Sequence, residues 1–283
     1  MSKSLPAVLI LVLLCSCIKK DEVKVTVGGS ANPSAPMFWD GNPFPLNIYV
    51  SQSFEDNEKE VLRVAAEKWE TAHGMSEDWF NFQAGKVPEI STSNFLGMSS
   101  DNRIGIYQTS PWPYNSYILA LVNISYFAYN KGTTSEYHVM VQADMMFNTQ
   151  HSNFTIDGSA GYDLGTVALH EFGHVLGLKH TSDTPYSLKS TSVMYPSISF
   201  VDIRPDPFQA DINKLADLYN INTGSNSLLG ASALRGPAAQ SKYVAFDDGV
   251  PEVLQIELRR DGECVHKTSS GEIIHRHQSA HLK

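Results

Sequence analysis

The sequence predicts a mixed α/β (α+β) fold built around one main globular domain. Strand-like runs rich in β-branched and aromatic residues alternate with segments whose apolar residues recur at helical spacing. The 283 residues are 42% hydrophobic and 18% charged, which is enough apolar material for one sizeable core. The same composition is too apolar for an intrinsically disordered chain.

The charge balance argues against a nucleic-acid-binding protein. The chain has 21 Lys and Arg against 30 Asp and Glu, a formal net charge of −9. Contacts to a phosphate backbone need clustered positive charge, and no Lys or Arg run is longer than a pair. Beyond the N-terminus, no apolar stretch approaches the roughly 20 residues of a membrane-spanning helix. We therefore expect no nucleic-acid partner and a water-soluble main domain.

The N-terminus has the pattern of a secretory signal peptide, which we assign to residues 1–16. Lys3 precedes the apolar run 7–14, which is too short to span a membrane. The next residues, 14–17 (Leu-Cys-Ser-Cys), resemble a bacterial lipobox, so that Cys17 would be the lipidated first residue of the mature protein. An ordinary signal peptide that is cleaved elsewhere in this stretch remains the alternative.

Lipidation of Cys17 would tether the protein to a membrane through residues 17–36. This stretch contains Gly, Ser, Asn and Pro with scattered charge, as is typical of a solvated linker. Ile18, where inner-membrane lipoproteins carry Asp, favours the outer membrane. The expected location is thus the bacterial cell envelope, lipid-anchored at the outer membrane or cell surface, or the secreted state. In that mature form only Cys264 of the three cysteines remains, and no intrachain disulfide can form.

The first predicted elements are a strand at 44–50 and a helix that continues to about Ala72. Ser53, followed three residues later by Asp56, resembles a helix-capping signal, and Gly74 ends the helix. Further strands are expected near 80–82, 103–107, 119–126 and 139–148.

A cluster of histidines between residues 165 and 180 carries the chemistry. On a helix, His170 and His174 project from the same face and can both bind one metal ion. Glu171 lies one position further on, where a carboxylate can reach metal-bound water without being a ligand. Gly177 permits the positive φ that ends a helix, so that His180 can return as a third ligand. Three nitrogen ligands leave a fourth position open, as in catalytic zinc sites.

This pattern is too long to be accidental. With 10 His, 14 Glu and 19 Gly in 283 residues, the full spacing H-E-x-x-H-x-x-G-x-x-H is expected by chance about 4 × 10⁻⁵ times. The alternative, in which the histidines are ordinary residues of an amphipathic helix, is therefore disfavoured.

The histidine pattern resembles the extended motif of the metzincin zinc peptidases. Ser192-Val193-Met194-Tyr195-Pro196 resembles their Met-turn, and the Met-Tyr-Pro form is most similar to the matrixins, the matrix-metalloprotease group. The resemblance implies that Met194 lies beneath the metal and that Tyr195 and Pro196 line the specificity pocket.

Two more segments extend the resemblance over residues 40–222, within an expected domain 37–222. Residues 208–219 are similar to the closing C-terminal helix of matrixins. Ala143, Asp144 and Met145 resemble the edge strand against which an extended substrate binds. The resemblance implies a zincin-like catalytic domain with a twisted mixed β-sheet, an active-site helix and a C-terminal helix.

The implied function is that of a zinc-dependent metalloendopeptidase acting on extracellular or envelope proteins. One Zn²⁺ would be held by His170, His174 and His180, and Glu171 would activate a zinc-bound water. The expected partners are a protein or peptide substrate and, through the lipid anchor, a membrane; the protein is expected to be a monomer.

The sequence departs from matrixins in three respects. The interval from His180 to Met194 is longer than usual, which indicates an insertion. No Pro-Arg-Cys-Gly latency motif precedes the domain, so a cysteine switch is not supported. The ligands of a second, structural zinc are not found, and His138 and His151 are interpreted as ordinary residues. Structural Ca²⁺ is possible, but no site is defined.

Residues 223–283 form a C-terminal extension of unknown role. A linker over 223–241 precedes strand candidates at 243–246 and 253–258. The extension is either a small β-rich appendage or a tail that packs on the catalytic domain. Its cysteine and histidines fit no tetrahedral metal template, and we interpret them as a solvated terminus: Cys264, His266, His275, His277 and His281.

Two alternatives to the matrixin reading remain. One is an astacin-like metzincin, which the Met194-Tyr195-Pro196 sequence disfavours. The other is a non-catalytic surface-binding protein on a peptidase scaffold, which the intact histidines and Glu171 disfavour.

Overall fold

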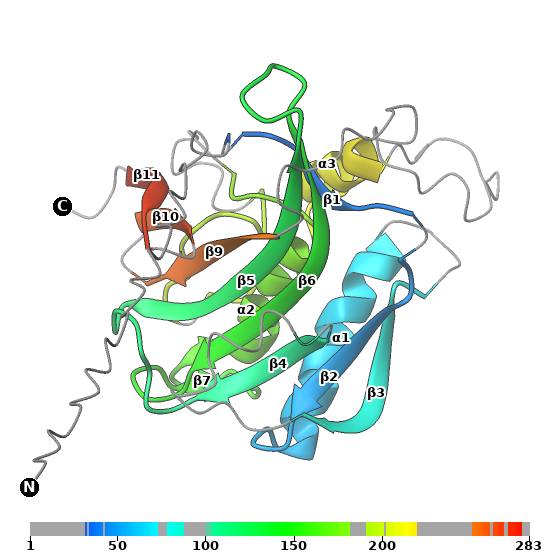
Figure 1. Ribbon diagram of the computed structural model, residues 1–283. Helices are drawn as coiled ribbons and strands as arrows, with labels where there is room; N and C mark the ends of the chain where they lie inside the picture. The colour runs from blue at the N-terminus through cyan, green and yellow to red at the C-terminus, as the bar shows by residue number, and fades with distance from the viewer. Residues whose placement is uncertain are drawn as a thin grey trace, which may run out of the picture.

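A mixed β-sheet of nine strands organises the described part of the molecule (Figure 1). The computed structural model describes residues 32, 34–41, 43–72, 78–87, 101, 103–181, 191–200, 202–219, 251–260, 263–268 and 271–278. The sheet order is β11-β10-β9-β5-β6-β4-β2-β3, and β1 also pairs with β6. Its strands are β1 (Met37–Trp39), β2 (Leu46–Ser51), β3 (Phe80–Val87), β4 (Ile104–Thr109), β5 (Ile118–Tyr129), β6 (Tyr137–Asn148), β9 (Glu252–Arg259), β10 (Glu263–Thr268) and β11 (Ile273–Gln278).

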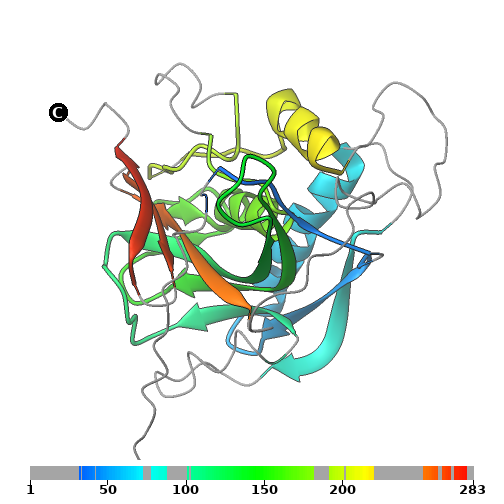
Figure 2. The ribbon, with the colours of Figure 1, turned by 45° about the horizontal axis from the view of Figure 1, so that its top comes forward.

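Three helices and one small sheet complete the fold. Helices α1 (Asp56–Ala72) and α2 (Leu164–Val175) lie on the same face of the large sheet, and α3 (Gln209–Tyr219) closes one end (Figure 2). Strands β7 (Phe154–Thr155) and β8 (Tyr162–Asp163) pair just before α2 begins. One continuous apolar core fills the space between the sheet and the helices and includes Trp69, Phe147 and Phe172. The predicted α/β class is confirmed.

The strands expected from 44 to 148 all form, with boundaries shifted by a few residues. Helix α1 starts at Asp56, but the capping interaction differs from the expected one. The backbone N–H of Glu55 donates to the Glu58 carboxylate, whereas the Ser53 hydroxyl bonds to Ser51. Strand β1 was not expected, because three residues are too few to show a period.

The expectation that Ala143–Met145 form a free sheet edge is wrong. Strand β6 pairs along its length with β5 on one side, and on the other side with β1 over His138–Met140 and with β4 over Met145–Asn148. Met145 has partners in both neighbours, Val122 and Ile106. The apolar residues of β6 predict a buried strand, but a buried strand can lie in the interior of a sheet as well as at its edge.

The C-terminal extension continues the same sheet. Strand β9 pairs antiparallel with β5, and β10 and β11 follow outward. The sequence left two interpretations of this extension, a separate β-rich appendage or a tail that packs on the main domain, and the described part fits the second. The strand candidate 243–246 lies outside the described residues.

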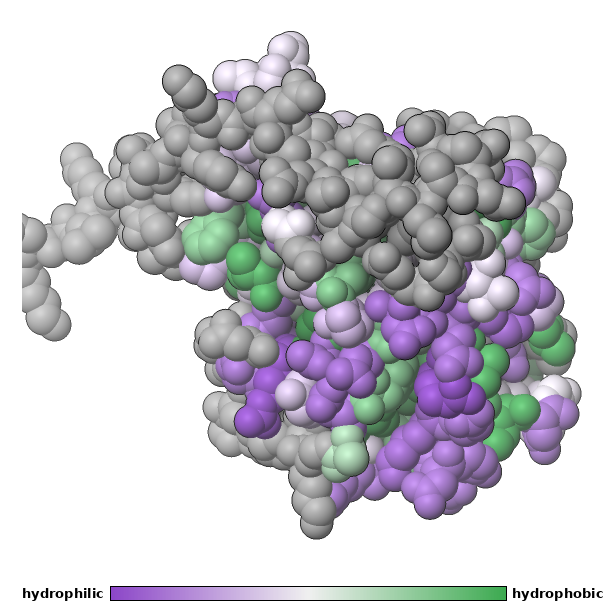
Figure 3. Space-filling view, turned by 90° about the vertical axis from the view of Figure 1, so that its right-hand side faces the viewer, coloured by the Kyte–Doolittle hydropathy of each residue, from purple (hydrophilic) through white to green (hydrophobic). Residues whose placement is uncertain are grey.

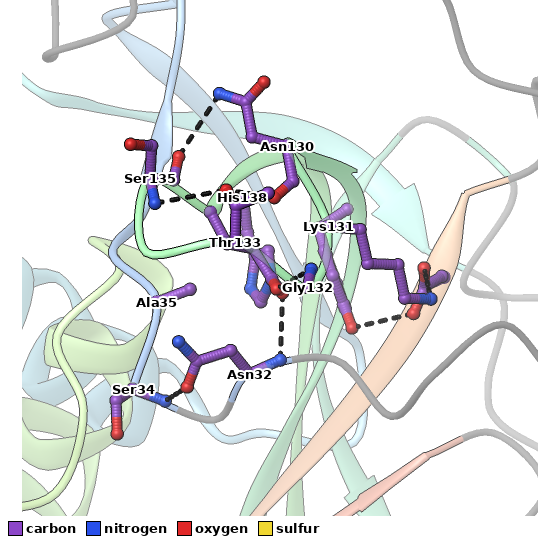
Figure 4. A network of polar contacts seen from close by, with 12 residues as sticks. Asn32, Ser34, Ala35, Asn130, Lys131, Gly132, Thr133, Ser135 and His138 are labelled. Atoms are coloured by element: carbon purple, nitrogen blue, oxygen red, sulfur yellow. Dashed lines mark hydrogen bonds and ion pairs between the residues drawn. The ribbon is translucent and has the colours of Figure 1, made fainter.

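A polar network joins the segment before β1 to the turn between β5 and β6 (Figure 4). The Glu136 carboxylate accepts hydrogen bonds from the backbone N–H groups of Asn32 and Gly132, and bonds to His138 Nε2 at 2.9 Å. His138 is therefore a buried structural residue, as the sequence suggested. Residues 1–31, with Cys17, lie outside the described residues.

The surface on the side of β3 and α1 is mainly hydrophilic, with small apolar areas between the polar ones (Figure 3). On α1, Arg63 forms ion pairs with Glu60 and Glu67, all partly exposed. Such exposed pairs contribute little to stability. No helix in the described ranges has the length and apolar character needed to cross a membrane.

Asp144 makes stability depend on pH. Burial raises the pKa of its carboxyl to about 8, while Gly105 N–H and Gln142 donate hydrogen bonds to it. The unfolded chain releases this proton near pH 4. The contribution of Asp144 to stability is thus complete below about pH 4 and is lost as the pH rises towards 8.

We therefore predict that Asp144→Asn flattens the pH dependence of stability. As the pH is raised from 5 to 8, the unmodified protein should lose stability that the variant keeps. The free energy of unfolding of the variant minus that of the unmodified protein, measured by urea denaturation, should therefore increase. Parallel pH profiles for the two proteins would show that Asp144 does not carry this dependence.

Candidate active site

Helix α2 lies in the interior, and every residue in it except Gly165 is buried. Asp163 caps its N-terminus, because the side chain accepts a hydrogen bond from the Thr166 N–H at 2.7 Å. At the other end, Trp39 Nε1 donates to the Val175 carbonyl and the Tyr219 hydroxyl to the Leu176 carbonyl. These contacts satisfy carbonyls that have no partner within the helix.

Gly177 ends α2 and directs the chain back towards the histidines. Its φ is +89°, and a Cβ placed there would lie 2.1 Å from the Met37 carbonyl oxygen. The Leu178 N–H bonds to the Gly173 carbonyl and the Gly177 N–H to that of His174, as in a Schellman turn. His180 follows directly after this turn.

The three predicted ligand histidines meet at one point. The Nε2 atoms of His170, His174 and His180 lie 3.0–3.1 Å from one another. In a tetrahedral site with ion–nitrogen distances of about 2.0–2.1 Å, such nitrogens are about 3.3–3.4 Å apart. Within the described ranges, these residues form the only group of three or more His, Cys, Asp or Glu side chains with converging ligand atoms.

The tautomers of two of these rings are fixed by backbone carbonyls. The Nδ1 atom of His170 bonds to the Val193 carbonyl and that of His174 to the Leu178 carbonyl, each at 2.7 Å. A carbonyl only accepts, so both Nδ1 atoms carry the proton and both Nε2 atoms carry a lone pair. The 3.1 Å contact between these two Nε2 atoms therefore brings two lone pairs together. This arrangement fits a bound cation.

Burial keeps these two rings in the neutral form that binds metals. Desolvation lowers the pKa of His174 to about 4 and that of His170 well below its usual value. At neutral pH neither ring needs to lose a proton before it binds an ion.

Glu171, which lies between these two histidines in the sequence, is fully buried. Neither carboxylate oxygen has a hydrogen-bond partner among the described residues. Desolvation raises the pKa of this carboxyl well above its usual value. A buried carboxylate without partners is costly to stability, which is common where a group serves a reaction.

The Met-turn packs directly beneath α2. The Met194 Sδ atom lies 2.3 Å from the position that a Cβ on Gly173 would take, so a larger residue here would displace the Met194 side chain. Tyr195 and Pro196 are both buried, and the Tyr195 ring lies 5.9 Å from the Arg204 guanidinium carbon. The turn also supplies the Val193 carbonyl that orients His170.

Asp211 and Arg204 hold the Met-turn in place. The Asp211 carboxylate accepts hydrogen bonds from the Val193 and Phe208 N–H groups at 2.8 and 3.2 Å, and also from the Ser192 hydroxyl. Buried Arg204 donates to several carbonyls of the turn and the residues after it, among them that of Ser197 at 2.6 Å.

Sequence reasoning gave neither residue a role. Both act through long-range hydrogen bonds that leave no periodic signal in the sequence. Of the other histidines considered, His138 bonds to Glu136, and His151 is exposed. The interpretation of His266 as part of a solvated terminus is wrong, because this residue is buried on β10.

Residues 118–220 match the family model described as Matrixin. A human protein named Matrix metalloproteinase-27 is 42% identical over 71 residues, or 25% of this chain and 12% of the human one. Metalloendoproteinase 1 of Glycine max is 41% identical over 64 residues, 23% and 19% of the two chains. Metalloendoproteinase 2-MMP of Arabidopsis thaliana is 37% identical over 68 residues, 24% and 16%. The aligned regions thus span less than a fifth of these curated relatives.

Because Asp211 fixes the turn that orients His170, we predict that Asp211→Ala weakens both the fold and the metal site. The change leaves two buried donors and one part-buried donor without their acceptor and should lower the free energy of unfolding by about 3 kcal/mol. The zinc affinity should fall as well, as measured by competition with a chromogenic chelator.

Asp217→Ala is the matched control, because Asp217 is exposed on the same helix. It should change stability by less than about 0.5 kcal/mol. Equal effects of the two substitutions would contradict the role given to Asp211.

Proposed function

We propose that this chain, which is a matrixin-like metzincin over residues 118–220, is a zinc-dependent metalloendopeptidase. The observation that carries the proposal is the convergence of three histidine Nε2 atoms next to a buried, unpartnered Glu171. The names of the matrixin relatives, a matrix metalloproteinase and two metalloendoproteinases, support the same reaction class.

The metal and the protein contribute different parts of the chemistry. When bound by His170, His174 and His180, Zn²⁺ supplies a Lewis acid that polarises a carbonyl and lowers the pKa of water. The carbonyls of Val193 and Leu178 hold two of these rings in the ligating tautomer, so that little rearrangement is needed on binding.

Glu171 is assigned the proton transfers. It accepts a proton from the water that attacks the scissile carbonyl and donates it to the departing amine. The burial that raises the pKa of this carboxyl brings it closer to neutral pH, where a group can both accept and donate a proton. Tyr195 and Pro196 are assigned to the wall of the pocket for one substrate side chain.

Location and substrate class are also part of the proposal. A signal peptide over residues 1–16 and lipidation at Cys17 would place the domain outside the cytoplasm, where envelope or extracellular proteins are the accessible substrates. A calcium site remains a prediction of the sequence.

Cleavage of an unfolded protein tests the reaction class. Purified protein with one equivalent of zinc should cut casein, a chelator should abolish the cleavage, and added zinc should restore it. A metal-loaded and folded protein without peptidase activity would favour the non-catalytic binding protein instead.

We predict that Glu171→Gln lowers casein cleavage by about 10²–10⁴-fold, because the general base is lost. Zinc content, measured by elemental analysis, should stay at one equivalent. The melting temperature should not fall, since the change removes a buried, unpartnered carboxylate.

Glu60→Gln on the exposed face of α1 is the control and should leave cleavage unchanged. Undiminished proteolysis by metal-loaded Glu171→Gln protein would refute the assignment.

A further inference from the structure

Strand β9 pairs with the side of β5 that β6 leaves open. It runs antiparallel to β5 from Tyr126↔Glu252 to Ile118↔Arg259. At its far end, Arg259 also forms a parallel bridge with Ser197, three residues after Met194. At Arg259, strand β9 thus lies between β5 and the segment that follows the Met-turn, whereas over Leu254–Glu257 its outer neighbour is β10.

The apolar side chains of β9 face the same side of the sheet as the core residues of β5. Ile256 pairs with Val122 and Leu258 with Ala120, and all four are in the main core cluster with α2. Because residues two apart in a strand share a face, Leu254 also points to this side. The side chains of Leu254, Ile256 and Leu258 therefore face the helix side of the sheet, where the histidines lie.

Strand β10 brings a fourth histidine over the site. His266 pairs with Ile256 and so lies on the same face of the sheet. Its ring centroid is 5.6 Å from that of His180, and only 3% of the residue is exposed. His266 is not one of the three side chains whose ligand atoms converge. It covers the metal site rather than completing it.

The site with the three converging histidines is closed to solvent. His170, Glu171 and His174 are 0% exposed and His180 is 7% exposed. Peptide hydrolysis requires a substrate carbonyl beside these groups, and an extended peptide commonly binds by adding a strand to a sheet edge. The side of β5 that β6 leaves open would be such an edge, and it is already paired with β9.

Ion pairs also hold β9 in place, both on the sheet face away from α2 and at its first residue. Buried Glu257 forms ion pairs with Arg259 and with Lys267 of β10. At the start of β9, Glu252 pairs with Lys131 at 2.7 Å, on the turn after β5 (Figure 4). Residues 118–220, which match the matrixin model, do not include this C-terminal segment.

We propose that β9 and β10 form a displaceable cover that binds the β5 edge in place of substrate and keeps the site closed. Substrate and β9 then compete for the same backbone hydrogen bonds, and cleavage requires β9 to leave. This inference rests on the proposed function. It gives the C-terminal segment a regulatory role in a chain in which we find no cysteine-switch motif.

A reversible cross-link between β5 and β9 tests the cover. Asn123 and Gln255 are register partners on the sheet face away from α2, so a disulfide there does not enter the site. We would introduce Asn123→Cys and Gln255→Cys into the full chain, with Cys15, Cys17 and Cys264 changed to Ser. The oxidised, zinc-loaded protein should cut casein at least tenfold more slowly than the same protein after reduction.

The single variants Asn123→Cys and Gln255→Cys are the matched controls, and reduction should not change their activity. Equal activity of the oxidised and reduced double variant, with the disulfide verified by mass, would overturn the proposal. If the reduced form cuts nothing, the proposed peptidase function fails.

Hydrogen exchange gives a readout that does not depend on catalysis. In the unmodified protein the β9 amides should exchange at least tenfold faster than those of β6, and the cross-link should slow them. Addition of casein to zinc-loaded Glu171→Gln protein should further speed exchange in β9 but not in β6. Protection of β9 equal to that of β6, unchanged by casein, would show that β9 is a permanent part of the fold.

Discussion

The repulsion between lone pairs of neighbouring imidazoles is the constraint on which the site depends. Two neutral rings whose Nε2 atoms are 3.1 Å apart do not stay together unless the protein holds them or a cation lies between them. Here the protein holds the rings in place, because the carbonyls of Val193 and Leu178 accept hydrogen bonds from the Nδ1 atoms. A cation bound between the Nε2 atoms would remove the remaining repulsion.

The surrounding structure serves to keep these two carbonyls in position. The Leu178 carbonyl is placed by the turn at Gly177, which is itself pressed against β1. The Val193 carbonyl belongs to the Met-turn, which Asp211 and Arg204 hold from α3 and from the segment before it. Elements far apart in the sequence therefore converge on two hydrogen bonds of 2.7 Å. This organisation explains why Ser192, Arg204 and Asp211 are buried near the site, since each of them forms hydrogen bonds that hold the turn.

Local sequence patterns predicted the parts of the molecule that depend on local interactions. The spacing of His170, Glu171 and His174 requires only the helical repeat, and the strands follow from runs of apolar residues. Sequence patterns did not indicate which strand lies at an edge, because β5 and β6 are both rich in apolar residues and the outer side of β5 is paired with β9, more than a hundred residues away. The roles of Asp211 and Arg204 depend in the same way on tertiary contacts.

The pairing of β5 with β9 also bears on the order in which the protein folds. These strands are joined over a sequence separation of well over a hundred residues, and such contacts form late because the intervening chain must first be ordered. The helix and turn that carry the three histidines involve much shorter sequence separations, so the histidines can assemble before β9 pairs with β5. In that interval the folding protein exposes its reactive centre to the surrounding solution, and the arrival of β9 ends the exposure.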